Sequence, residues 1–108
     1  MQKLTVKTER RTQLIDVTKQ VQAAVGEGTD ATAVLVFVPH TSAGVTITEF
    51  ADPLVAEDLE NALQKVVDDD WNWKHVDDPD GPNAPSHVRA SLIGTQILVE
   101  NTAKILFR

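Results

Sequence analysis

The sequence of 108 residues predicts a single-domain protein of the α+β class. Three observations lead to this prediction. Short segments in which apolar and polar residues alternate indicate strands, and one long segment with apolar residues at helical spacing indicates an amphipathic helix. Hydrophobic residues make up 42% of the chain and charged residues 24%, which are ordinary values for a globular domain with a packed core.

The first segments of the chain are expected to pair as a hairpin. Residues 4–8 alternate apolar and polar side chains, as a half-buried strand does. A turn at residues 10–12 then leads to a second expected strand at residues 13–17.

A helix is expected over residues 18–25, because the apolar side chains of this region also fit a helical stripe. Asp16 or Thr18 would cap its N-terminus, since a side-chain oxygen can accept a free N–H of the first turn. Gly26 and Gly28 would end it.

The most apolar stretch of the chain, residues 33–38, predicts a central buried strand. Pro39 ends this strand because proline has no N–H to donate. Residues 44–49 alternate again and predict a strand with one face in water.

Residues 53–66 have the pattern of an amphipathic helix of about four turns. Asp52 supplies a capping oxygen, and Pro53 suits the first helical position because the N–H that it lacks would be unpaired there. The apolar residues of the expected buried stripe recur at helical spacing: Val55, Leu59, Ala62, Leu63 and Val66.

Residues 68–85 have no periodicity, and they are rich in Asp and Pro. A loop of this length is uncommon in a compact domain unless it has a function. Trp71, Trp73 and Val76 give the loop apolar anchors, so we expect it to be ordered and functional.

The last part of the chain predicts one more helix and two strands. Ser86 would cap a short helix over residues 87–93, and Gly94 would end it. Strands are expected at residues 95–100 and 105–107.

The composition argues against several classes of function. The chain has no cysteine, which excludes disulfides, thiolate zinc sites and cysteine nucleophiles. The net charge of −6 argues against binding to nucleic acid or to anionic membranes. No apolar stretch is long enough to span a bilayer, so we expect a cytoplasmic protein.

The three histidines of the chain are the main candidates for a functional site. His40 follows the most apolar strand, His75 lies in the acidic loop, and His87 begins the last expected helix. Each lies among turn-forming and polar residues, so we predict that the three converge on one pocket. Three imidazoles with an open position are typical of a catalytic zinc site. The spacings of 35 and 12 residues match no short zinc motif, so the prediction of a metal site depends only on the expected convergence of the histidines.

Further polar residues are expected around the histidines. Ser42 would point in the same direction as His40 if the chain stays extended. Glu49 and Asp58 are candidate acidic groups, and Asn83 and Ser86 are candidates for binding a ligand at the N-terminus of the last helix. Each segment by itself also fits ordinary turn residues or solvated charges. The sequence contains no nucleophile elbow, phosphate-binding loop or dinucleotide fingerprint.

Together these segments resemble the YjbQ-like family, also catalogued as UPF0047. The resemblance covers the region from about Leu4 to about Val99. The first matching stretch is His40-Thr41-Ser42-Ala43, followed by Glu49, Asp52-Pro53 and Asp58. His75 comes next. The last stretch is Asn83-Ala84-Pro85-Ser86-His87, followed by Ser91-Leu92-Ile93-Gly94.

The resemblance implies an α+β fold with a two-layer β arrangement and two main helices, assembled as a homotrimer. It also implies a weak thiamine-phosphate synthase activity, which joins a pyrimidine diphosphate to a thiazole phosphate. In this comparison the three histidines occupy the recurrent histidine positions of the family. The recurrent polar positions are Ser42, Glu49, Asp52 and Asp58.

The C-terminal region departs from the family pattern. Family members continue after the strand at residues 95–100 with a Gly-Thr-Trp-Gln turn and further strands. Here residues 101–105 replace that turn and the sequence stops at Arg108, so we expect the C-terminal strands of the family to be shortened or missing.

Three functions remain open from the sequence. In the first, the histidines of an enzyme bind zinc, with Glu49 or Asp58 as base or supporting group. In the second, the histidines act as acids and bases on a phosphorylated small molecule, with Mg²⁺ on carboxylates. In the third, Trp71 and Trp73 form a platform in a metabolite-binding or regulatory module without turnover.

Overall fold

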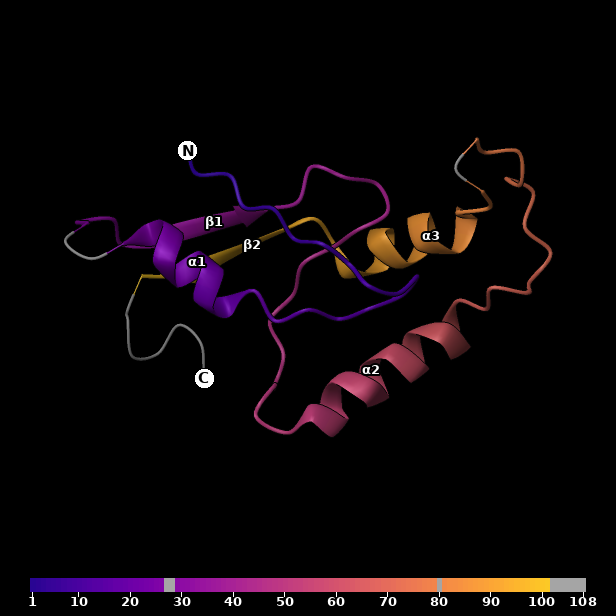
Figure 1. Ribbon diagram of the computed structural model, residues 1–108, viewed down its shortest axis with the longest axis horizontal. Coiled ribbons are helices and arrows are strands. Elements are labelled where there is room, and N and C mark those ends of the chain that lie inside the picture. Colours follow the sequence, from indigo (N-terminus) through magenta and orange to yellow (C-terminus); the bar gives the residue numbers. More distant parts are fainter. Residues whose placement is uncertain (27–28, 80, 102–108) are drawn as a thin grey trace.

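The computed structural model describes residues 1–26, 29–79 and 81–101, and within them it has an α+β fold. The predicted class is therefore confirmed. The chain is elongated, with extents of 50 × 30 × 22 Å. Figure 1 shows the two strands and the first helix toward one end of the long axis and the last helix toward the other. The elements in chain order are α1 Thr18–Val25, β1 Ala33–Phe37, α2 Pro53–Val66, α3 Ala84–Ile93 and β2 Gln96–Glu100.

The sheet of the described residues consists of β1 and β2, which pair antiparallel with Leu35 opposite Leu98. Both strands lie close to the predicted positions. The prediction that β1 is central and buried is wrong, because alternate residues face solvent: Leu35 is 59% exposed, Phe37 57% and Leu98 71%. The run of apolar residues reflects a strand that is apolar on both faces, one of which is not covered by any of the described residues.

Three other strand predictions are not met. Residues 4–8, 13–17 and 44–49 have no strand structure, although they alternate as strands do. Alternation records which side chains face inward, whereas a strand also needs a hydrogen-bonding partner along its edge. The expected second β layer is therefore absent from the described residues. The strand expected at 105–107 lies outside them.

Helix α1 has the predicted bounds, but its N-cap is different. Val17 occupies that position and offers no side-chain acceptor. The carboxylate of Asp16, one residue earlier, accepts hydrogen bonds from the hydroxyl and the backbone N–H of Thr18. These two bonds, the hydroxyl first, lower the pKa of Asp16 below its ordinary value. Gly26 ends the helix at a φ of 74°, as predicted, and Gly28 lies outside the described residues.

Helix α2 begins as predicted. Asp52 accepts a hydrogen bond from the backbone N–H of Leu54 at 2.9 Å, and Pro53 is the first helical residue. No residue of α2 is buried, and Leu54 and Val66 are 61% and 73% exposed. The apolar stripe of α2 is thus only partly covered by the described chain.

Helix α3 begins earlier than predicted. Its first residue is Ala84, with Pro85 in the first turn and Asn83 at the N-cap position. Ser86 therefore lies inside the helix and does not cap it. Because Pro85 lacks an N–H, it is well suited to the first turn, and this moves the start of the helix toward the N-terminus.

The buried part of the described chain is small, and it is divided between the region where α3 meets the chain after α2 and the region of α1 and β2. Arg89 of α3 is buried and donates hydrogen bonds from Nη2 to the carbonyl of Val67 at 2.7 Å and to Asp69 at 2.8 Å. The buried apolar residues of the described chain are Val21, Val67, Ala84, Ala90 and Val99. Among the residues described, none of the helices is long and apolar enough to cross a membrane.

Candidate active site at the His75–His87 pair

Two of the three histidines come together. The ring centroids of His75 and His87 lie 5.5 Å apart, with an angle of 46° between the ring planes. His87 belongs to the first turns of α3, and His75 lies in the long connection between α2 and α3. The connection before α3 and the first turns of α3 thus bring the two imidazoles close together in a tilted arrangement.

A backbone carbonyl holds His87. Its Nδ1 lies 2.9 Å from the carbonyl oxygen of Thr41. A carbonyl oxygen can only accept, so Nδ1 carries the proton and Nε2 of the neutral ring has a free lone pair. The hydroxyl of Ser42 lies 3.3 Å from the same Nδ1. Because that nitrogen is already protonated, His87 does not activate Ser42 as a nucleophile in this arrangement.

The segment that carries Thr41 is fixed against the end of α3. The backbone N–H of Val45 donates to the carbonyl of Gly94 at 3.0 Å. Gly44 makes this approach feasible, since a Cβ at its position would lie 2.7 Å from the Gly94 oxygen and 2.9 Å from Cγ2 of Ile93. A glycine at position 44 therefore allows the 41–45 segment to approach the C-terminal end of α3 closely.

A side-chain amide holds His75. Its Nε2 lies 3.0 Å from Oδ1 of Asn83, an acceptor, so Nε2 carries the proton and Nδ1 is free. The amide is oriented by its Nδ2, which donates to the carboxylate of Asp78 at 3.4 Å. The same carboxylate lies 3.8 Å from His75 Nε2. Asparagine is a favoured capping residue, yet Asn83 makes no side-chain cap on α3 because its amide is turned to His75.

The remaining predicted site residues are not joined to this pair. His40 is exposed and, among the described residues, makes no hydrogen bond or ring contact. Glu49 accepts hydrogen bonds from the backbone N–H groups of Ala51 and Asp52, so it orders the turn before α2. Asp58 is exposed on α2. Within the described part of the chain, no three or more His, Asp or Glu side chains are grouped to hold a metal ion. The single chain therefore offers two of the three predicted imidazole ligands.

A pocket of about 340 Å³ adjoins the pair at His75. Trp71 and Trp73 meet there edge to face, with ring centroids 4.9 Å apart. The indole N–H of Trp73 donates to the carbonyl of Asp68 at 2.9 Å, which fixes this ring. The pocket is lined by Arg11, Asp69, Asp70, Trp71, Asn72, Trp73, His75, Val76, Pro82, Ala84 and Pro85.

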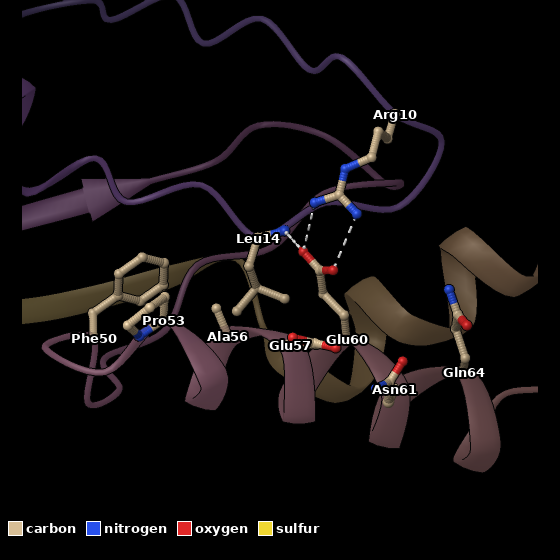
Figure 2. Close-up of a pocket in the computed structure, with 9 residues that line it drawn as sticks. All are labelled: Arg10, Leu14, Phe50, Pro53, Ala56, Glu57, Glu60, Asn61 and Gln64. Carbon is tan, nitrogen blue, oxygen red and sulfur yellow. Dashed lines mark hydrogen bonds and ion pairs between the residues drawn. The ribbon is translucent and has the colours of Figure 1, made fainter.

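A second, more open pocket of about 570 Å³ lies between α2 and the segment at residues 10–14 (Figure 2). At its centre Glu60 accepts a hydrogen bond from the backbone N–H of Leu14 at 2.8 Å and two from the guanidinium of Arg10 at 3.1 and 3.2 Å. The Leu14 bond and then the Arg10 contacts lower the pKa of Glu60 below its ordinary value. Since its polar centre is already paired, this pocket joins two segments and offers little to a ligand.

Comparison with known proteins agrees with this architecture. The family model described as UPF0047 protein YjbQ-like matches residues 2–106. The chain belongs to the YjbQ-like family. Among its relatives, UPF0047 protein MJ1081 of Methanocaldococcus jannaschii is 38% identical over 94 residues, which cover 85% of this chain and 64% of that protein. UPF0047 protein YugU of Bacillus subtilis is 36% identical over 107 residues, covering 95% of this chain and 78% of YugU.

Crystal structures of similar proteins have the same fold. A conserved protein of the YjbQ/UPF0047 family from Clostridium acetobutylicum is 40% identical, with a TM-score of 0.78 over 88% of this chain and 71% of that one. Hypothetical protein APE1520 from Aeropyrum pernix K1 is 32% identical, with a TM-score of 0.80 over 94% of this chain and 74% of that one. The chain thus spans about two thirds to three quarters of the length of these YjbQ-like relatives.

Several contributors to the site were not predicted from the sequence. The carbonyl of Thr41 leaves no mark in a side-chain pattern. Asp78 is one of several acidic residues in the loop, and the residues around Arg11 indicate only a turn. Gly44 alone had a usable signal, because a glycine two residues after Ser42 indicates a close approach of backbone.

Proposed function

We propose that this YjbQ-like protein is a small enzyme that acts on phosphorylated small molecules through the His75–His87 pair. The observation that carries the proposal is that each ring has one nitrogen held by a fixed acceptor, with the other left available. Anchoring of one nitrogen is the usual device by which a protein sets the tautomer of a working imidazole. Two rings so prepared at 5.5 Å are suited to move protons at one reacting group.

The surroundings assign different roles to the two rings. His87 has its proton on Nδ1, so Nε2 is the base. We assign the role of acid to His75, because two acceptors, Oδ1 of Asn83 at 3.0 Å and the Asp78 carboxylate at 3.8 Å, face its Nε2 and can stabilise positive charge on the ring. In that form Nδ1–H of His75 is the proton available to a leaving oxygen.

The family resemblance suggests one reaction of this kind. In thiamine-phosphate synthesis a thiazole nitrogen forms a bond to a methylene carbon of the pyrimidine while the carbon–oxygen bond to diphosphate breaks. The attacking nitrogen has no proton to lose, so the main demand is on charge developing at the leaving diphosphate. A protonated His75 could meet that demand.

A divalent ion, zinc first and Mg²⁺ second, is a further part of the proposal. The free nitrogens, Nε2 of His87 and Nδ1 of His75, are the groups that would hold it, and it would supply Lewis-acid stabilisation of phosphate oxygens. A zinc site with three imidazoles does not fit the described residues as they lie, because His40 is not grouped with the other two. No catalytic step here is therefore assigned to a metal.

The test compares the three histidine variants. We expect His75→Ala to lower rescue of a thiamine-auxotrophic strain, and both His75→Ala and His87→Ala to lower turnover of a phosphorylated substrate that must lose a proton, by roughly 10²- to 10⁴-fold, as loss of an acid or base does. His40→Ala is the matched control and should stay close to the parent. Calorimetry on untagged protein measures zinc binding, and the zinc affinity should fall in His75→Ala and His87→Ala but stay close to the parent in His40→Ala. Equal losses in all three variants would support the three-imidazole site, and unchanged rescue in all three would refute the proposal.

A second candidate is a metabolite-binding or regulatory module without turnover. It is favoured by the aromatic pocket at Trp71 and Trp73, which can hold a ligand without any chemistry. The two functions differ in product. Saturable binding with no product from any phosphorylated substrate would select the module.

We also propose that the protein assembles as a homotrimer, as the family resemblance implies. The outer face of the sheet supports an assembly, because Leu35, Phe37 and Leu98 expose apolar surface there. Light scattering coupled to size exclusion tests the mass. Leu35→Lys should shift the protein to a smaller species, whereas Glu100→Lys, at the polar end of the same strand pair, should not.

A further inference from the structure

We propose that the pocket beside His75 binds a flat aromatic ring that carries an anionic group, such as a phosphate. The proposal deepens the proposed function and rests on it in one respect, namely that the bound group would be presented to the His75–His87 pair. The pocket volume of about 340 Å³ falls within the range of small-molecule sites. The ring would lie on Trp71 and the anionic group would meet Arg11.

The aromatic part of the argument starts from Trp71, which is 65% exposed. An indole is a large apolar surface, and leaving it in water on a structured loop gives up the free energy that its burial would contribute. The ring is not loose, since its edge-to-face partner Trp73 is fixed by the hydrogen bond to the Asp68 carbonyl. An exposed indole on a fixed support, at the wall of a pocket, is a stacking surface for another ring.

Hydrogen bonds from α3 and within the loop itself hold the start of the loop that carries the two indoles. Arg89 of α3 bonds both the Val67 carbonyl and the Asp69 carboxylate at the start of the loop. The backbone N–H of Trp71 also donates to Asp68 at 3.3 Å. These bonds mean that the position of the aromatic pair does not have to be created by the ligand.

The anionic part of the argument comes from a contrast between neighbouring arginines. Arg10 is paired with Glu60 through two hydrogen bonds. Arg11 donates one bond, at 2.9 Å, to the carbonyl of Pro82, and in the part of the chain that the structure describes it has no carboxylate within ion-pair distance. Among the described residues the Arg11 guanidinium thus has no ion-pair partner, and most of its N–H groups are left for a ligand that lies in the pocket it lines.

The two carboxylates of the pocket restrict how the ligand lies. Asp69 is neutralised by Arg89 at 2.8 Å, whereas Asp70 has a solvent-facing carboxylate. Asp70 would repel an anionic group and accept a ring N–H or amino group. The charges therefore favour a ligand whose anionic end meets Arg11 and whose donor edge, where it has one, meets Asp70.

Tryptophan fluorescence reports on this pocket alone, because the two tryptophans of the chain both line it. The probes are phenyl phosphate, cyclohexyl phosphate, phenol, benzoate and inorganic phosphate. We expect saturable quenching by phenyl phosphate, with binding about tenfold weaker for cyclohexyl phosphate, which cannot stack, and for phenol, which lacks the charge. Benzoate separates a requirement for phosphate from a requirement for any anion.

Matched variants locate the two contacts. Arg11→Gln should weaken phenyl phosphate by about tenfold or more, and Arg10→Gln, which removes the same charge one residue away, should not. Trp71→Leu should weaken phenyl phosphate by about tenfold while leaving inorganic phosphate unchanged, with Trp73 retained as the reporter. Circular dichroism establishes that each variant is folded.

The outcomes separate this inference from the proposed function. Equal binding of phenyl and cyclohexyl phosphate, or equal effects of the Arg10 and Arg11 changes, would overturn the inference. His87→Ala should lower turnover by roughly 10²- to 10⁴-fold but leave phenyl phosphate binding intact. Binding that persists in a protein without any turnover would sink the proposed function and leave this site in place.

Discussion

Replacing Gly44 with alanine tests how closely the 41–45 segment is seated on α3. The added Cβ would lie 2.7 Å from the carbonyl oxygen of Gly94, 2.9 Å from Cγ2 of Ile93 and 3.1 Å from Cβ of Ile93. Comfortable carbon contacts are about 3.5–4.0 Å, so the new methyl group is roughly 0.4 Å or more too close to the two Ile93 carbons, and it is also too close to the Gly94 oxygen. One of these atoms is backbone and the others belong to a β-branched side chain, which cannot rotate freely out of the way.

The change in the free energy of unfolding follows from two destabilising contributions and one that offsets them. Crowding of this kind costs about 1–3 kcal/mol. A shift of the segment also lengthens the hydrogen bond from Val45 N–H to the Gly94 carbonyl, now 3.0 Å, at a cost of about 1 kcal/mol. The lower entropy of an unfolded chain with alanine offsets about 0.4–1 kcal/mol. Gly44→Ala should therefore destabilise the fold by about 2 kcal/mol, or roughly 10 °C in Tm.

Urea denaturation followed by circular dichroism measures this change as a lower midpoint at constant slope. Ala43→Ser is the control, because it adds one heavy atom at an exposed neighbour and should stay within about 0.5 kcal/mol of the parent. The same shift would pull the Thr41 carbonyl from His87, so activity should fall as well. A Gly44→Ala protein as stable as the parent would show that the segment is not packed on α3 as described.

Three further changes test other parts of the chain. Asp52→Ala removes the cap of α2 and should cost about 1 kcal/mol in urea denaturation, while Asp58→Ala on the same helix should cost less than half of that. Arg89→Met leaves the buried Val67 carbonyl without its donor and should cost about 2 kcal/mol, a result that a neutral midpoint would contradict. Glu60 has a folded-state pKa below its ordinary value of 4.5, so its ionised form stabilises the fold above that value and this contribution is lost as pH falls through the lower folded pKa. Denaturation from pH 7 to 3 should show the parent and Glu60→Gln furthest apart above about pH 5 and converging in acid; a constant gap would refute the assignment.

Local signals predicted the helices and the two paired strands well. The bounds of α1 and the Asp52–Pro53 start of α2 follow from capping chemistry and helical spacing, which act over a few residues. Short runs of apolar, β-branched residues predicted the positions of β1 and β2 to within one residue at each end. The start of α3 was missed because Ser86 is a good cap in isolation, whereas the fixed φ of Pro85 favours an earlier first turn.

The unpaired strands and the isolated histidine show where local signals end. Alternation at residues 4–8 and 44–49 says that one face should be covered, but it cannot say whether a neighbouring edge is present. His40 has the same kind of sequence surroundings as His75 and His87. Only the packing of the 41–45 segment against α3 brings Thr41, and not His40, to the ring of His87.

The sequence by itself determined the α+β class, the family, three helices and the candidate histidines, because these depend on spacing, caps and short motifs that neighbouring residues carry. The tertiary structure alone decided which histidines meet, which nitrogen of each ring is free, and which arginine has no ion-pair partner among the described residues. Those properties depend on contacts between residues up to 71 positions apart, such as Arg11 with the Pro82 carbonyl. No local pattern contains such distances, since they arise only when the whole chain has folded.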